Sequence, residues 1–145
     1  MDFFDSLSIS ASGLTAQQLR MNVISSNLAN INTTRTPEGG PYQRKEILFA
    51  SEPIRPAFQD ILHSQMSNKL SGVRVVGIAD DPRPALMKYE PTNPEANAQG
   101  YVAAPNINLI EEMVNMISAT RSYEAGITAI NSTKNMALKA LEIGR

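Results

Sequence analysis

The first group of residues with side chains suited to catalysis lies around position 63. His63 is the only histidine of the chain, and Asp60 and Ser64 stand close to it in sequence. Catalytic triads are assembled in space from distant segments, so adjacency along the chain does not indicate one. We therefore expect His63 to be a solvent-exposed polar residue and predict no catalytic residue in this segment.

Two neighbouring carboxylates, Glu111 and Glu112, are the second candidates for chemistry. A pair of carboxylates can act as general acid and base. Here, however, the pair follows Asn108, a residue type that caps helix N-termini well, and Glu111 has the spacing of a capping box. The first turn of a helix also favours negative charge. The pattern therefore predicts the start of a helix and no catalytic site.

Motifs for ligands are absent from the sequence. The chain has no cysteine and a single histidine, which excludes cysteine-ligated zinc and a multi-histidine metal site. It contains no GxGxxG, Walker or HExxH motif. The basic pair Arg44 and Lys45 has only Tyr42 nearby for stacking, which is too little for nucleic-acid binding. The sequence thus predicts no enzyme, no cofactor, no metal, no nucleic-acid partner and no small-molecule substrate.

The composition also limits the partners of the chain. Its 145 residues carry a formal net charge of -1, so no net field draws it to nucleic acid or anionic lipid. The acidic start, residues 1–5, lacks the positive charge of a secretory signal. No stretch approaches the roughly 20 apolar residues that span a bilayer. We expect no membrane insertion, and we expect any export to proceed without a cleaved signal peptide.

Proline positions divide the chain into three parts. All nine prolines lie between residues 37 and 105, and a proline inside a helix costs about 3 kcal/mol. Long helices are therefore expected only at the two ends. We predict an N-terminal helix in 1–33, a Pro-rich β and loop segment in 34–105, and a C-terminal helix in 106–145 that packs with 1–33.

Both ends carry a heptad-like stripe of residues at alternating steps of four and three, as in helices that pack side by side. The N-terminal stripe runs from Phe3 to Ile31, and the C-terminal stripe runs from Leu109 to Leu141. The residues that we predict to form subunit-packing interfaces are Leu7, Leu14, Met21, Ile24, Leu28, Met113, Met116, Ile117, Tyr123, Ile127, Ile130 and Leu141.

The segment between the helices has the composition of short strands and turns. A turn is expected at 38–41, and residues 57–70 fit a short helix or a mobile loop equally well. The expected strands, bounded by Gly, Pro and Asp, are 42–49, 73–78, 86–89 and 101–103. The predicted fold class is mainly α with a small β-rich insert: two long terminal helices form an antiparallel, coiled-coil-like pair, with a β-hairpin segment between them.

A single helix pair leaves little margin for folding. Ordering two long helices costs more conformational entropy than one seam of apolar side chains returns on burial. The stripes therefore predict further helices supplied by other subunits. The alternative is a helical hairpin within one chain that packs on its own β segment.

Three short motifs resemble those of the flagellar rod and hook axial proteins. The family's C-terminal E-M-V and R-x-Y-E-A motifs match 112–114 and 121–125, the latter with Arg121, Tyr123 and Glu124. In one departure, Gly126 stands where asparagine is common in the family. The family's N-terminal helix ends in an N-L-A-N-x-N-T motif, which is matched here by Asn27, Leu28, Ala29, Asn30, Asn32 and Thr33.

The resemblance implies a structural subunit of the bacterial flagellar basal-body rod, the drive shaft that crosses the periplasm and transmits motor torque for motility. It implies helical assembly with itself, with other flagellar rod proteins and with the rod–export-gate junction protein. It also implies export by the flagellar type III export apparatus. Asn27, Asn30 and Asn32 are expected to satisfy helix-end and loop backbone groups.

Two other interpretations stay open at the level of sequence. One is a different rod or hook subunit, although hook-type proteins normally carry a larger middle part than residues 34–105. The other is a secreted, non-enzymatic binding module or translocator with amphipathic helical ends. Against the latter, the polar faces of both helices lack the richness in Lys and Arg that interfacial helices use.

Overall fold

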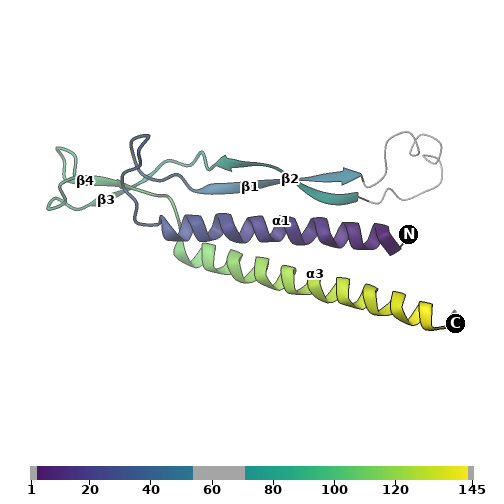
Figure 1. Ribbon diagram of the computed structural model, residues 1–145. Helices are drawn as coiled ribbons and strands as arrows, with labels where there is room; N and C mark the ends of the chain where they lie inside the picture. The colour runs from purple at the N-terminus through teal and green to yellow at the C-terminus, as the bar shows by residue number, and fades with distance from the viewer. Residues whose placement is uncertain (1–2, 54–70, 144–145) are drawn as a thin grey trace.

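The computed structural model describes residues 3–53 and 71–143 and contains two long helices and two small antiparallel sheets (Figure 1). The predicted fold class is therefore confirmed. The segment 57–70, with His63, Asp60 and Ser64, lies outside the described residues. In chain order the elements are α1 (Phe3–Ala29), β1 (Lys45–Pro53), β2 (Ser71–Asp80), β3 (Leu86–Tyr89), β4 (Tyr101–Ala104) and α3 (Leu109–Ile143).

Helix α1 lies between the β1–β2 hairpin and α3 (Figure 1). Three contacts fix the direction of α3. Arg20 Nη2 donates to Asn115 Oδ1 at 3.5 Å, Thr120 Oγ1 donates to Met21 Sδ at 3.6 Å, and Leu14 lies against Gly126. Since residue numbers rise along α3 as they fall along α1, the two helices are antiparallel, as predicted.

The face of α3 that packs on α1 differs from the predicted stripe. At every second position of the pattern, the packed residue lies one place before the predicted one. Small residues explain the displacement, because Ala119 and Gly126 let the helices approach closely where a pattern of large apolar residues points elsewhere. The positions of α3 that are buried or half-buried at alternating steps of four and three are Glu112, Met116, Ala119, Tyr123, Gly126, Ile130, Thr133 and Ala137.

At Gly126 the two helices approach each other closely. A Cβ atom at this position would lie 2.8 Å from Leu14 Cδ2 and 3.2 Å from Leu14 Cγ. A glycine inside a helix costs about 1 kcal/mol relative to alanine. Here that cost is offset by the room that the missing side chain leaves for Leu14.

The β1–β2 hairpin lies along the other side of α1 (Figure 1). Its register runs from Lys45 opposite Asp80 to Pro53 opposite Ser71, with a bulge next to Leu48. Ser12 ties the hairpin to the helix because its Oγ accepts a hydrogen bond from the backbone N–H of Val73 at 3.1 Å. Both expected strands are present, although β1 begins at residue 45 and continues to residue 53.

The short β3–β4 hairpin lies beyond the end of α1 and next to the start of α3 (Figure 1). Tyr89 and Tyr101 face each other across the two strands, with ring centroids 5.3 Å apart. Gly100 closes the hairpin at φ +82°, and a Cβ atom there would lie 2.9 Å from Tyr89 Cε2. The predicted strands 86–89 and 101–103 are confirmed.

Candidate functional site: the polar junction and the outer helix face

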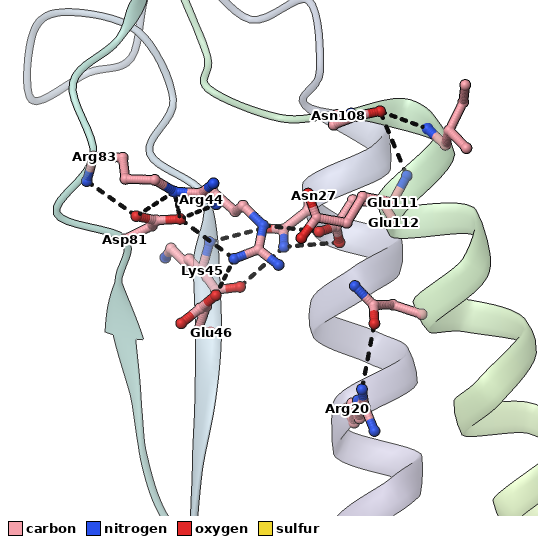
Figure 2. A network of polar contacts seen from close by, with 12 residues as sticks. Arg20, Asn27, Arg44, Lys45, Glu46, Asp81, Arg83, Asn108, Glu111 and Glu112 are labelled. Carbon is pink, nitrogen blue, oxygen red and sulfur yellow. Dashed lines mark hydrogen bonds and ion pairs between the residues drawn. The ribbon is translucent and has the colours of Figure 1, made fainter.

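A buried amide at the C-terminal end of α1, that of Asn27, lies at the centre of a network of polar contacts (Figure 2). Asn27 is 1% exposed. Its Nδ2 donates to Lys45 O at 2.9 Å and to Glu112 Oε2 at 3.2 Å. Its Oδ1 accepts from Lys45 N at 2.9 Å and from the Tyr42 hydroxyl at 3.2 Å. One side chain thus joins α1, β1 and α3.

An ion-pair network continues from Asn27 into the hairpin (Figure 2). Glu112 is also 1% exposed, and its Oε1 accepts from Arg44 Nε at 2.8 Å. Arg44 Nη1 lies 3.3 Å from Asp81 Oδ2 and contacts the Glu46 carboxylate. We call Tyr42 and the five residues Asn27, Arg44, Glu46, Asp81 and Glu112 the polar junction.

Arg83 holds Asp81 in place from the solvent side. Its backbone N–H donates to Asp81 Oδ1 at 3.0 Å, and its Nη2 donates to Asp81 Oδ2 at 2.6 Å. These side-chain and backbone hydrogen bonds hold the pKa of Asp81 well below its usual range. Burial alone would lower the pKa of Arg44. Hydrogen bonds to Glu46 and Glu112 outweigh this effect, so the pKa of Arg44 lies above its ordinary value. Asp81 and Arg44 therefore stay ionised at neutral pH.

Next to the junction, α1 ends in a set of local hydrogen bonds. Asn30 Nδ2 donates to Ser26 O at 2.9 Å, and the backbone N–H of Thr33 donates to Asn30 O at 3.0 Å. Tyr42 returns to this point, since its backbone N–H donates to Thr33 O at 3.0 Å. The start of α3 is capped in the same region by Asn108, whose Oδ1 accepts from the Ile110 N–H at 3.0 Å.

A second feature is the face of α3 that points away from α1. Ile110, Met113, Val114 and Ile117 stand at positions i, i+3, i+4 and i+7, so they share one side of the helix. Ile110 is 73% exposed and Ile117 is 53% exposed. We call these four residues the outer stripe. A row of large apolar side chains left in water is typical of a surface that packs against another protein.

The junction supports structure rather than catalysis. Its carboxylates are engaged by Arg44 and Arg83, and no group of acidic or histidine residues within 3–53 and 71–143 is arranged to hold a metal ion. Within the same residues, no helix is both long and apolar enough for a membrane crossing.

Comparison with known proteins places the chain in a family. The family model "Flagella basal body rod protein" matches residues 7–35, and the model "Flagellar basal body rod FlgEFG protein C-terminal" matches residues 98–143. The chain is 50% identical over 152 residues to the flagellar basal-body rod protein FlgC of Bacillus subtilis, with 100% of both chains covered. It is 46% identical to FlgC of Borreliella burgdorferi, with 99% of this chain and 98% of that protein covered. The chain belongs to the FlgC family of flagellar basal-body rod proteins.

Membership of the FlgC family makes the chain a structural rod protein and not an enzyme. It also decides against the alternative of a secreted binding module or translocator. The two matched ranges meet at the polar junction, because one contains Asn27 and the other contains Glu112. The junction thus connects the two parts of the chain that the FlgC-family models recognise.

The predicted packing residues divide into two groups in the FlgC-family structure. Those of α1 contact other parts of the same chain, with Ile24 buried and Leu7, Leu14, Met21 and Leu28 half-buried. On α3, Met116, Tyr123 and Ile130 are half-buried, whereas the exposed members are Met113, Ile117, Ile127 and Leu141. The exposed members leave most of their surface free of contacts within the described part of the chain.

The motif residues also divide by role. Asn27 and Asn30 bind backbone groups of the strand and of the helix end, as predicted. Asn32 makes no hydrogen bond within the part of the chain that the structure describes, and Ala29 is exposed. Arg121 and Glu124, on either side of Tyr123, point into solvent.

Sequence reasoning missed the charged members of the junction. By sequence, Arg44 is half of a weak basic pair and Glu112 is a first-turn carboxylate, yet both are buried and joined to each other. The partners are 68 residues apart, so no local pattern connects them. The available signal was the E-M-V motif, which begins with Glu112.

Proposed function

We propose that this FlgC-family chain assembles into the rod through the outward faces of its helices and transmits motor torque by that packing. The observation that supports this proposal is the outer stripe. Ile110, Met113, Val114 and Ile117 have the spacing of a helix face that packs on another helix, and the chain itself leaves them exposed. Burial against neighbouring subunits would supply the apolar contacts that one helix pair lacks.

In this proposal the three parts of the chain have separate roles. Residues 1–33 and 106–145 form a coiled-coil-like axial part that runs along the rod, and residues 34–105 form an outer layer between neighbouring subunits. Contacts between unlike surfaces that do not close into a ring generate a helical array. Long helices joined in such an array resist twisting, which is the mechanical property a drive shaft needs.

The polar junction would give each subunit its stiffness. Sliding α3 along α1 would separate Glu112 from both Arg44 and Asn27, and it would leave buried polar groups without partners. A small displacement therefore carries a large penalty, whereas an apolar seam alone would permit it. The junction fixes the register in which the outer stripe is presented.

The partners that follow from this proposal are further copies of the chain, the other rod proteins and the rod–export-gate junction protein. The flagellar type III export apparatus would carry the chain to the periplasm without removal of a signal peptide. Membership of the FlgC family supports these partners and this location.

The test is a charge placed on the outer stripe. We expect Ile117→Asp to abolish rod assembly, because assembly would bury an unpaired carboxylate. The isolated chain should fold normally, since Ile117 is 53% exposed. Rods are counted in basal bodies by electron microscopy, and the exported subunit is measured by immunoblot.

The matched control is Lys139→Asp, an exposed position of the same helix outside the outer stripe. This variant should assemble nearly normally. Ile127→Asp places the same charge at the edge of the face of α3 that packs on α1, because Ile127 is 39% exposed and lies beside Gly126. Intact rods containing the Ile117→Asp subunit would show that the outer stripe is not an assembly surface.

A further inference from the structure

The β1–β2 hairpin has one face that packs on α1 and another that is turned away from it. A Cβ atom at Gly72 would lie 2.8 Å from Ser12 Oγ, so Gly72 and its cross-strand partner Glu52 are on the α1 side. The bulge adds its extra residue to β2, so the side chains of β1 alternate regularly between the two faces. Phe49 and Ile47, three and five residues before Glu52, are therefore on the side turned away from α1.

Apolar side chains cover this outward side of the hairpin. Ile47 is opposite Ile78 in the register, and Phe49 is opposite Val75. Residues that are directly opposite each other share one face of the sheet. Ile78 is 50% exposed and Phe49 is 42% exposed, so the chain leaves much of this surface in contact with water. We call these four residues, Ile47, Phe49, Val75 and Ile78, the sheet face.

The sheet face and the outer stripe are on opposite sides of the molecule. Helix α1 lies between the hairpin and α3 (Figure 1), and each of the two surfaces is turned away from α1. Their lengths agree, since Ile110 to Ile117 extend about 10 Å along α3 and Val75 to Ile78 extend about 10 Å along β2. One chain thus carries two apolar surfaces of similar length that cannot reach each other.

The charged residues at the junction end of the two surfaces are complementary. Lys45 begins β1 on the outward side of the hairpin, and Glu111 follows Ile110 at the start of α3. Lys45 is opposite Asp80 in the register, but no ion pair holds its ammonium group among the described residues. Within the same ranges, the carboxylate of Glu111 also forms no ion pair. An acidic group beside the outer stripe can therefore meet a basic group beside the sheet face.

We propose that the sheet face of one copy of this chain covers the outer stripe of a neighbouring copy, with both copies pointing in the same direction. Ile78 would lie against Val114, and Lys45 would pair with Glu111. A helix packed on a sheet is a common layer arrangement, and here it would place the hairpin between α1 of its own chain and α3 of the next. This inference rests on the proposed assembly through the outer stripe and names the surface that covers it.

The arrangement of the two surfaces makes the contact an open one. It joins unlike surfaces on opposite sides of the chain, and such a contact repeats from copy to copy and generates a helical array where the rotation does not close a ring. Rotation about a common axis keeps elements that run along this axis in the same direction. The junction ends of neighbouring copies therefore stay together, which is the condition for pairing Lys45 with Glu111.

The absence of cysteine from the chain permits a direct cross-linking test. A chain with Ile78→Cys and Val114→Cys is expressed in flagellated cells, basal bodies are oxidised with copper phenanthroline, and the subunit is followed on non-reducing gels. We expect covalent multimers of the subunit, and none from either single variant. A second pair, Phe49→Cys with Ile117→Cys, should give the same products and keeps the test decisive if the first double variant fails to assemble.

The matched control is Leu48→Cys with Val114→Cys. Leu48 is 51% exposed, as Ile78 is 50% exposed, but it is on the α1 side of the hairpin, four residues before Glu52. This pair should give several-fold less product. Adding Lys45→Glu to the chain with Ile78→Cys and Val114→Cys should also lower the yield several-fold, and adding Glu111→Lys as well should restore it.

The outcomes separate this contact from the assembly proposal on which it rests. Assembled subunits that give no covalent multimers from either pair would overturn the contact, as would an equal yield from the Leu48→Cys pair. If a thiol at residue 117 were nevertheless protected in the rod, assembly through the outer stripe would stand and a different partner would cover it. A thiol at residue 117 that stayed fully accessible in assembled rods would overturn both proposals.

Discussion

Removal of the Asn27 amide is the perturbation with the clearest consequence. Asn27→Ala deletes four hydrogen bonds of a side chain that is 1% exposed. Two of the four partners keep another contact, since the Tyr42 hydroxyl lies 3.3 Å from Ser26 Oγ and Glu112 keeps Arg44. The N–H and C=O of Lys45 are the groups left without a side-chain partner.

The expected loss follows from those two backbone groups. An unsatisfied buried donor or acceptor costs about 1–3 kcal/mol, so the two together should lower the free energy of unfolding of Asn27→Ala by about 2–6 kcal/mol. That is a large share of the roughly 5–15 kcal/mol by which a domain is stable. Asn27→Asp should also destabilise, because it removes the donor and sets a carboxylate against Glu112 Oε2.

The assay is urea unfolding of the purified chain, followed by far-ultraviolet circular dichroism. Asn131→Ala is the control, since it makes the same substitution at an exposed position in the middle of α3. Its effect should stay within about 0.5 kcal/mol. If Asn27→Ala were as stable as Asn131→Ala, the polar junction would not hold the elements together, and its role in fixing the register would have to be abandoned.

Three further outcomes follow from the structure. Gly126→Leu should destabilise by about 1–3 kcal/mol through overpacking against Leu14, measured by urea unfolding; an unchanged midpoint would contradict the close approach. The pKa of Asp81 is lowered in the folded chain, so its stabilising effect is full above the ordinary carboxyl pKa near 4 and is lost as pH falls toward the folded value. Asp81→Asn should therefore lose less stability than wild type between about pH 5 and pH 3. An identical acid unfolding profile for the two chains would refute this. In the dilute chain, amides of 138–143, beyond the reach of α1, should exchange faster by mass spectrometry than those of 112–126; equal protection would contradict it.

The helices could be predicted because local physics determines them. Confinement of the prolines to the middle of the chain leaves the ends free for helices, Asn108 caps α3 as its residue type suggests, and the strands follow Gly and Pro punctuation. The residues of α3 that pack on α1 could not all be predicted, because Ala119 and Gly126 contribute by being small. A search for large apolar residues passes over such positions.

The polar junction could not be predicted from the sequence for a different reason. Arg44 precedes β1, Asp81 follows β2 and Glu112 lies in α3, so all three meet only once the β1–β2 hairpin has formed and α3 has packed in place. By itself each residue fits an ordinary local explanation. Asn27 was recognised through its motif, but its four partners depend on the tertiary fold.

If the outer stripe of α3 becomes buried between subunits, its solvent accessibility falls on assembly, and thiol labelling measures that accessibility. Ile117→Cys gives a single thiol in a chain without cysteine, and Lys139→Cys gives a reference thiol outside the stripe. Both are treated with a maleimide reagent in the free chain and in isolated basal bodies. We expect residue 117 to react in the free chain and to be protected in the rod, while residue 139 changes much less. Equal labelling of residue 117 in both states would contradict it.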